Sequence, residues 1–407
     1  MNLLELKVLT LNVWGIPYVS SDKETRISAI ANQLSIGNYD IVALQEVWSE
    51  ADFQIIQQEN ESVLPYSHYF YSGVFGAGLC IFSKYPIVAT IFHSWPVNGY
   101  FHKFQHGDWF GGKGVALCRI LIKNQIVNVY NTHLHAEYDP KNDDYKTHRA
   151  IQAFHTAQFI QATRGKAVLQ ILAGDLNSQP DEVSYKTILH TSKMNDCCPY
   201  EDIGTNECIR NSYSTTEAIK KNPVGLRIDH IFARAFKKYT VFVDEYKLPF
   251  PERIPGYKFS YSDHEAVCVK ICVTEKSKNK EIDSEGDDLE KCRLEWRKEN
   301  EFVTADILKE CINLCEKSIK KLRTDRMFYY SITTFIIFLL VILVDFRVPY
   351  GFRTLYLFSK FILFGIALFS LFMATIWNHM ERNGIRSAKH SMEIALKSLH
   401  DYPIFQE

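Results

Sequence analysis

The 407-residue chain lacks the features of a secreted or disulfide-stabilised protein. It has ten cysteines and no Cys-X-X-Cys pair, so a disulfide scaffold, a zinc ribbon and a thioredoxin motif are not supported. Met1–Leu11 alternates apolar and polar residues and includes Glu5 and Lys7, so we expect a first strand there rather than a signal peptide. These absences favour a reducing, cytosolic setting.

The chain also lacks an excess of positive charge. Lys plus Arg number 46 and Asp plus Glu number 47, and within residues 1–272 the corresponding counts are 26 and 28. A protein that coats nucleic acid, or a nuclease, is expected to carry a basic surface. We therefore expect no nucleic-acid partner.

Three common catalytic motifs are missing as well. The sequence contains no HExxH, no GxSxG and no GxxxxGK[ST], which excludes zincin, α/β-hydrolase and P-loop enzymes in their standard forms. The chemistry therefore has to come from residues dispersed along the chain.

Residues 1–273 have the pattern of an α/β domain. Short β-rich runs bounded by turns alternate with two amphipathic helical runs, 22–35 and 144–163. We predict a two-sheet β-sandwich flanked by helices, and the pattern leaves a single mixed sheet open as an alternative. The predicted strands are 7–11, 41–45, 78–82, 115–122, 126–132, 169–172 and 266–273.

The last part of the chain has a different composition. Residues 274–291 are mostly charged or polar and predict a linker, and 292–326 predict a juxtamembrane helical segment. Two apolar runs follow, 328–344 and 355–377, and a span needs about 17 to 25 residues. We predict a C-terminal helical membrane module over 327–378, a hairpin of two transmembrane helices, and a cytosolic tail over 379–407.

Charge asymmetry predicts the orientation of this hairpin. Basic residues are frequent in 317–326 and 382–397, whereas the turn between the spans holds Arg347 and Arg353. The positive-inside rule then places both flanks, and the first domain, in the cytosol. The modest span lengths favour the endoplasmic reticulum or another endomembrane. The basic run before the first span could bind an anionic lipid, although topology alone also explains it.

Polar residues lie at the ends of the predicted buried strands, where an α/β sandwich gathers distant side chains into one site. Asp, Asn and Glu supply the hard oxygen ligands that Mg²⁺ prefers, and histidines can transfer protons. The set indicates metal-assisted hydrolysis of a phosphoester. Its members are Asn12, Glu46, Asn131, His133, His135, Asp175, Asn177, Asp229, Asp263 and His264.

Six motifs in this set resemble those of a known superfamily. TLNVWG, LQEVW, NTHLHAEY, GDLNSQP, RIDHIF and SDHEAV, spread from Asn12 to His264, resemble the signature blocks of the endonuclease/exonuclease/phosphatase (DNase-like) superfamily. LNVWGIP, HLHAEY, HGDWFGGKG and the C-terminal pair of spans are similar to the neutral sphingomyelinases, in particular the small animal type. The resemblance implies an enzyme that hydrolyses sphingomyelin to ceramide and phosphocholine with Mg²⁺.

The resemblance also implies roles for single residues. Glu46 would be the main Mg²⁺ ligand, assisted by Asn12 and Asp263. His264 would be the general base, oriented by Asp229, although superfamily members differ on whether this His or the Asp of GDLN acts as the base. The remaining roles are positioning of water and a phosphate oxygen by Asp175 and Asn177, and donation to the phosphorane by His133.

The segment 95–114 has two interpretations. Its aromatic residues could form the core of a hairpin, or a flap that touches the membrane interface. Within it, Asp108 and Lys113 match the Asp and Lys, five residues apart, of a switch in related sphingomyelinases, where pairing withdraws the Asp from the catalytic centre. The aromatic residues are Trp95, Tyr100, Phe101, Phe104, Trp109 and Phe110.

Three alternatives to a sphingomyelinase stay open at this point. A phospholipase C acting on lysophosphatidylcholine or lyso-platelet-activating-factor lipids would recognise the same phosphocholine group. A nuclease is disfavoured by the charge of residues 1–272. A catalytically inactive membrane scaffold would have no use for Asn12, Glu46 and His264 together.

Overall fold

The computed structural model describes residues 2–103, 106–139, 141–276, 286–346, 348 and 350–401. It divides into two units, Met1–Ile307 and Leu308–Glu407. Part of the predicted linker, 277–285, lies outside the described residues, as do Phe104 and Arg347. The predicted domain boundaries at 273 and 291 stay predictions.

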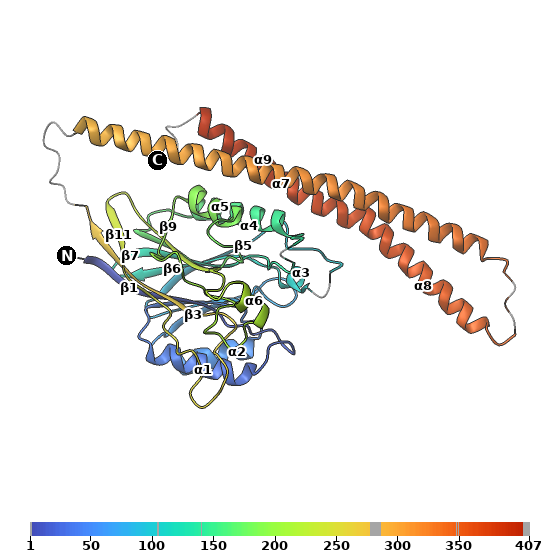
Figure 1. Ribbon diagram of the computed structural model, residues 1–407, viewed down its shortest axis with the longest axis horizontal. Coiled ribbons are helices and arrows are strands. Elements are labelled where there is room, and N and C mark those ends of the chain that lie inside the picture. Colours follow the sequence, from blue (N-terminus) through green and yellow to red (C-terminus); the bar gives the residue numbers. More distant parts are fainter. Residues whose placement is uncertain are drawn as a thin grey trace. The chain divides into compact units, whose positions relative to one another are not determined.

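The first unit contains two six-stranded mixed sheets (Figure 1). The first sheet has the order β11-β12-β1-β2-β4-β3 and the second β5-β6-β7-β8-β10-β9. The predicted two-sheet α/β sandwich is confirmed, and the single mixed sheet is excluded. The strands are β1 Asn2–Asn12, β2 Ile41–Gln45, β3 Tyr66–Phe70, β4 Leu79–Ser83, β5 Ile87–Ser94, β6 Gly114–Ile122, β7 Gln125–His133, β8 Leu169–Asp175, β9 Asn195–Asp196, β10 Asp229–Ala235, β11 Tyr239–Lys247 and β12 Val267–Glu275.

The central strands are apolar on the face that meets the other sheet and become polar where they end. In β8, Ile171 and Ala173 lie in the layer between the sheets, and Asp175 follows on the same face. Alternate side chains of a strand share a face, so each strand delivers its last inward side chain to one end of this layer. β1, β2 and β7 follow the same pattern and end inward at Asn12, Gln45 and His133, and β10, which is antiparallel to β8, begins inward at Asp229.

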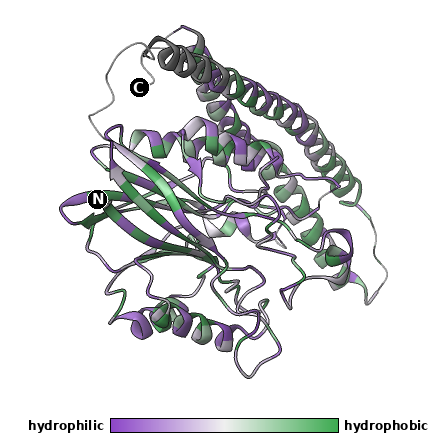
Figure 2. Cartoon of the chain, turned by 60° about the vertical axis from the view of Figure 1, so that its left-hand side comes forward, coloured by the Kyte–Doolittle hydropathy of each residue, from purple (hydrophilic) through white to green (hydrophobic). Residues whose placement is uncertain are grey.

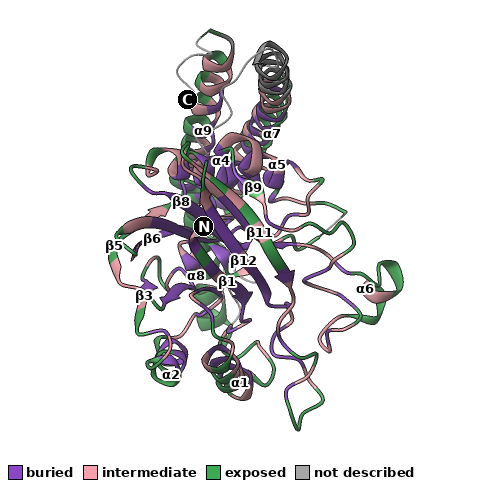
Figure 3. Cartoon of the chain, turned by 90° about the vertical axis from the view of Figure 1, so that its left-hand side faces the viewer, coloured by how far each residue is buried: buried purple, intermediate pink, exposed green. Residues whose placement is uncertain are grey.

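Helices cover the outer faces of both sheets. Helices α1 (Lys23–Ile36) and α2 (Glu50–Asn60) pack with residues of the first sheet in one core, and α4 (Lys146–Ala162) and α5 (Val183–Ser192) pack with the second (Figure 1). The predicted helices at 22–35 and 144–163 are thus confirmed. In the first sheet, β1 and β12 are buried, and the edge strand β11 beside them is more exposed (Figure 3). Two short helices, α3 (Asp108–Gly111) and α6 (Thr216–Lys221), lie in loops.

The second unit consists of long helices, the first of which begins before Leu308. Helix α7 runs from Gly286 to Ile342, and α8 (Arg353–Phe372), the π-helix η2 (Met373–Trp377) and α9 (Asn378–Asp401) follow one another without a gap. Two helices here are long and apolar enough to cross a membrane, and their apolar stretches are visible in Figure 2. Helix α7 passes through residue 326, where the predicted juxtamembrane segment meets the first predicted span.

Helices α7 and α9 contact each other outside the apolar stretches. Asn378 Nδ2 donates to the carbonyl oxygen of Leu322 over 2.7 Å, and Lys389 Nζ lies 3.1 Å from Glu316 Oε1. Cys311 and Ala388 are both fully buried in this unit. The predicted tail is thus helical as far as Asp401, and its last six residues lie outside the described range.

Gly174 is required where β8 passes β7. Its φ is +152°, and a Cβ at this position would lie 2.0 Å from the carbonyl oxygen of Thr132. We expect Gly174→Ala to lower the free energy of unfolding by about 3 kcal/mol, because the neighbouring strand cannot yield. Gly165→Ala is the matched control: Gly165 also has positive φ, +52°, but meets nothing closer than 3.8 Å. Equal losses for both variants in denaturant unfolding would contradict the steric explanation.

Candidate active site

Five strand ends bring the predicted site residues together. In the sheet register His133 lies opposite Asp175, and Asp175 lies opposite Asp229. Asn12 ends β1, and Glu46 directly follows β2, the parallel neighbour of β1. The site therefore forms at the polar end of the layer between the sheets.

Asn12 connects the two halves of the site. Its Nδ2 donates to Glu46 Oε1 and to Asp175 Oδ2, each over 3.0 Å, while its Oδ1 accepts from the backbone N–H of Trp14 over 2.9 Å. Asp175 also accepts from the backbone N–H of Asn177 over 2.8 Å. Because an amide oxygen has two lone pairs, Asn12 Oδ1 retains one for a further partner.

His264 and Asp229 form a buried pair. His264 Nδ1 lies 2.8 Å from Asp229 Oδ2, and His264 Nε2 lies 3.8 Å from Asp175 Oδ2. The Asp229 contact favours a proton on Nδ1, and Nε2 is then the ring nitrogen that faces the site. Ser262 fixes the loop, because its Oγ donates to the carbonyl oxygen of Asn12 over 2.6 Å and lies 3.2 Å from Asp263 Oδ1.

Burial and neighbouring charges shift the pKa values of the site residues. Burial raises the pKa of Glu46, and the nearby Asp263 raises it further. Burial, together with Asp229, raises the pKa of Asp175 to about 7. For His264 burial acts downward, but the carboxylates of Asp229, Asp263 and Asp175 outweigh it, so its pKa is raised. This accumulation of buried carboxylates favours binding of a cation.

The donor set fits a divalent metal. Glu46 Oε2 is buried and has no hydrogen-bond partner among the described residues, an arrangement that costs free energy unless a cation or water completes it. Asp175, Asp229 and His264 each offer a ligand atom within 4.8 Å of one another. Mg²⁺ prefers carboxylate and carbonyl oxygens, so Glu46, Asn12 and the neighbouring aspartates suit it better than the histidine.

Three residues of the site hold a left-handed backbone. Glu46 has φ +57°, Asn177 has +44° and Trp14 has +49°. Such conformations cost about 1–3 kcal/mol each and persist where the surrounding structure fixes them. Here they turn the chain sharply as it leaves β1, β2 and β8.

The contacts of His133 depend on its tautomer. Its Nε2 lies 3.3 Å from Lys113 Nζ and 3.5 Å from Asp175 Oδ2. A neutral ring accepts from Lys113 with its proton on Nδ1, whereas donation to Asp175 requires the proton on Nε2. Burial, and then Lys113, hold the pKa of His133 well below its ordinary value, so the ring is neutral.

Asp108 and Lys113 are paired in this structure. Tyr138 OH donates to Asp108 Oδ2 over 2.6 Å, and His135 Nε2 lies 3.6 Å from the same oxygen. Burial acts against ionisation of Asp108, but His135 and Lys113 outweigh it and hold its pKa well below the usual range. Because Lys113 also approaches His133, the Asp108–Lys113 pair lies beside the residues at the strand ends.

Arg26 supports the loops of the site, and the sequence did not indicate it. Its buried guanidinium donates to the carbonyl oxygens of Val13 (2.8 Å), Trp14 (2.7 Å) and Tyr261 (3.2 Å), and it lies 4.8 Å from the Trp14 ring. It thus joins the loop after β1 to the loop that carries Asp263. Its positive charge also acts on Asp263 and Glu46. No local pattern in helix α1 distinguishes Arg26 from a surface arginine.

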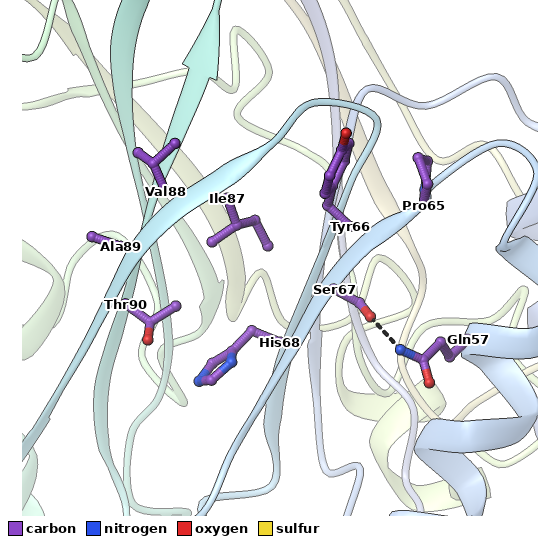
Figure 4. A pocket seen from close by; sticks show the side chains of 9 residues that line it. All are labelled: Gln57, Pro65, Tyr66, Ser67, His68, Ile87, Val88, Ala89 and Thr90. Carbon is purple, nitrogen blue, oxygen red and sulfur yellow. Dashed lines mark hydrogen bonds between the residues drawn. The ribbon is translucent and has the colours of Figure 1, made fainter.

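The aromatic residues of segment 95–114 divide between the two interpretations. Trp95 and Tyr100 are buried, as a hairpin core requires, whereas Trp109 is exposed. A separate pocket of about 420 Å³ lies at the edge strands β3 and β5, lined by Tyr66, His68 and Thr90 among others, and contains none of the predicted site residues (Figure 4).

Comparison with known proteins identifies the class of protein to which this fold and site belong. Residues 9–264 match the model of the Endonuclease/Exonuclease/phosphatase family. Sphingomyelinase C from Streptomyces griseocarneus has the same fold, with a TM-score of 0.51, 21% identity, and coverage of 66% of this chain and 99% of that one.

Two relatives narrow the class. A Drosophila melanogaster protein named "Putative neutral sphingomyelinase" is 52% identical over 100% of both chains. "Sphingomyelin phosphodiesterase 2" of Rattus norvegicus is 37% identical over 66% of this chain and 65% of its own. The chain belongs to the neutral sphingomyelinase family of the endonuclease/exonuclease/phosphatase superfamily.

Proposed function

We propose that this chain is a Mg²⁺-dependent sphingomyelin phosphodiesterase, which hydrolyses sphingomyelin to ceramide and phosphocholine. The observation that carries the proposal is the buried centre itself: Asn12 bridges Glu46 and Asp175, and the His264–Asp229 pair faces Asp175. Membership of the neutral sphingomyelinase family supports the choice of lipid.

Glu46, Asn12 and Asp263 are the residues that would hold Mg²⁺. The orphaned Glu46 Oε2 and the free lone pair of Asn12 Oδ1 support this assignment. When bound, Mg²⁺ would stabilise negative charge on the phosphoryl and leaving oxygens. Arg26 would hold the two ligand loops at a fixed separation.

The protein groups then have separate tasks. His264 Nε2 takes a proton from water, and Asp229 holds the ring so that this nitrogen faces the site. The water oxygen forms a bond to phosphorus, the bond from phosphorus to the ceramide oxygen breaks, and solvent protonates the ceramide alkoxide. Asp175 and Asn177 position the water and a phosphate oxygen, and His133, with its proton on Nε2, or Lys113 donates to the phosphorane.

The two apolar C-terminal helices support membrane anchoring, with the catalytic domain on the cytosolic face of an endomembrane such as the endoplasmic reticulum. An anionic lipid headgroup is a further candidate ligand at the end of the spans. There burial lowers the pKa of Arg382, and the positive charges of Arg386, Arg326 and Arg323 lower it further. The Nε atoms of Arg326 and Arg382 are buried and lack a hydrogen-bond partner among the described residues.

Phosphocholine release tests the function directly. The full chain is assayed in detergent micelles with sphingomyelin and, in parallel, with lysophosphatidylcholine, each with Mg²⁺ and with EDTA. We expect Mg²⁺-dependent release from sphingomyelin that is lost in His264→Ala. Faster release from lysophosphatidylcholine would show that this lipid is the preferred substrate of the same reaction. Release from neither lipid would refute the proposed function.

The metal-free protein should lose stability as pH rises from about 6.5 to 8. Asp175, with a folded pKa of about 7, and His264, with a raised pKa, hold their protons more tightly in the folded than in the unfolded chain. The stability from these protons is present below their unfolded pKa values and is lost as pH rises through the folded ones. The lowered pKa values of the buried His133 and His135 make the stability rise with pH. This opposite effect is confined to pH values below about 6.5, the pKa of histidine in the unfolded chain.

Thermal unfolding in EDTA measures this dependence. The midpoint should fall between pH 6.5 and 8, and saturating Mg²⁺ should remove the fall because the metal competes with protons for the same oxygens. Asp175→Asn should have a shallower dependence than the wild type. A midpoint that does not change with pH in EDTA would contradict the raised pKa values.

A further inference from the structure

An exposed apolar surface lies beside the active site on the first unit. It consists of two loop segments that hydrogen bonds hold together: the backbone N–H groups of Val74 and Phe75 donate to the carbonyl oxygen of Phe110 over 2.9 and 3.3 Å, and Ser72 Oγ donates to Gly112 over 2.8 Å. We call this surface the aromatic patch. Its members are Tyr71, Val74, Phe75, Phe101, Trp109 and Phe110.

Ring contacts make the patch continuous. Phe75 and Phe110 have centroids 6.1 Å apart, Phe110 and Trp109 5.1 Å, and Trp109 and Phe101 4.9 Å. The outermost side chains remain in solvent, since Val74 is 70% exposed and Phe75 59%. Phe75 and Trp109 are therefore exposed at the surface, and Phe101 and Phe110 lie partly buried beside them.

Two of the segments that form the patch carry little charge. Residues 69–79, YFYSGVFGAGL, contain no charged side chain, and in 107–112, GDWFGG, the single charge is Asp108, which is buried and paired with Lys113. Loops at a surface are ordinarily polar, and a contiguous apolar area of this kind marks an interaction site. Trp and Tyr at its border favour an interface between hydrocarbon and water.

The patch is directly connected to the catalytic residues. Trp109 follows Asp108 in helix α3, Lys113 contacts Asp108, and Lys113 Nζ lies 3.3 Å from His133 Nε2. A surface seated on the patch would meet the site at the same edge of the domain. The chain also carries two helices that are long and apolar enough to cross a bilayer.

We infer that the aromatic patch docks the catalytic unit onto the interfacial layer of the bilayer from which the lipid substrate is drawn. The inference rests on the proposed function for the identity of that lipid. Val74 and Phe75 insert at the level of the headgroups and upper acyl chains, and Trp109 lies at the same interface. Docking there shortens the path of the phosphocholine headgroup from the bilayer to Glu46 and His264.

The test compares bilayer and soluble substrates for the full chain in nanodiscs. The substrates are sphingomyelin in the disc and water-soluble p-nitrophenyl phosphocholine, assayed with the variant Val74→Ser/Phe75→Ser. We expect the ratio of the bilayer rate to the soluble rate to fall at least tenfold. The matched control, Val88→Ser/Phe242→Ser, removes exposed apolar side chains from the edge strands β5 and β11 and should leave the ratio unchanged.

A second readout does not depend on activity. In nanodiscs of brominated phosphatidylcholine, Trp109→Phe should remove part of the fluorescence quenching given by the six tryptophans. An unchanged rate ratio together with unchanged quenching would overturn the docking role, as would a patch variant that converts a dimer to a monomer. If the wild type released no phosphocholine while quenching still depended on Trp109, the proposed function would fail and the docking inference would stand.

Discussion

His264→Ala lowers kcat for phosphocholine release by about a thousandfold, because general acid–base groups contribute about 10²–10⁴-fold and His264 is the imidazole that the buried Asp229 orients toward the site. His264 Nδ1 is held by Asp229 over 2.8 Å, which leaves Nε2 for the proton of the attacking water. Initial rates on sphingomyelin micelles at saturating Mg²⁺ measure the effect. Added imidazole should restore part of the rate of the alanine variant.

The controls separate catalysis from structure. Asp229→Asn keeps the shape of the pair but removes the charge that orients and stabilises the imidazolium, so we expect a loss of at least a hundredfold. His68→Ala, on the partly exposed strand β3, should change the rate less than twofold. If His264→Ala kept more than a tenth of the wild-type rate, the base would have to be sought elsewhere, with Asp175 as the first alternative.

Glu46→Gln removes Mg²⁺ binding and with it at least a hundredfold of the catalytic rate. The substitution preserves shape but replaces the buried Oε2, which lacks a hydrogen-bond partner among the described residues, with a neutral amide. Calorimetry of Mg²⁺ binding to the full chain in detergent measures the loss. Because the charge that Mg²⁺ would neutralise is gone, the rise in Tm that Mg²⁺ gives the wild type should also disappear.

A second measurement, the Tm of the metal-free protein, should change in the opposite direction. Without metal, Glu46→Gln should have a higher Tm than the wild type, because burial and Asp263 raise the pKa of Glu46 and so disfavour its charged form. Glu50→Gln, a few residues along the chain on an exposed turn of α2, is the control and should change neither quantity. A Glu46→Gln protein whose Tm still rises with Mg²⁺ would show that the metal binds elsewhere.

Much of the catalytic domain could be predicted because its central strands are regular. All seven predicted strands and both predicted helices are present, since runs such as β8 are apolar on both faces and end at a turn. The site residues were found for the same reason: Asn12, Asp175 and His133 are polar residues at the ends of buried strands. Motif resemblance then assigned the roles, which stay predictions.

Other features could not be read from local sequence. Strand β5 has no buried residue and strand β11 has one, so neither carries the run of buried apolar residues that marks the central strands. Arg26 acts through carbonyl groups of the loops after β1 and before Asp263, contacts that appear only when the chain is folded. The composition changes sharply near Arg326, although the helical backbone of α7 continues through it.

The position of β1 has a consequence for the order in which the protein is made. β1 is synthesised first, yet it lies between β2 and β12, and its partner β12 is the last strand of the domain. The hydrogen bond from Ser262 to the Asn12 carbonyl oxygen likewise cannot form until Ser262 has been synthesised. On the ribosome, the catalytic domain therefore cannot complete its first sheet until residue 275 has emerged, shortly before the apolar helices do. Folding of the enzyme and delivery of its anchor to the membrane thus fall in the same interval of translation.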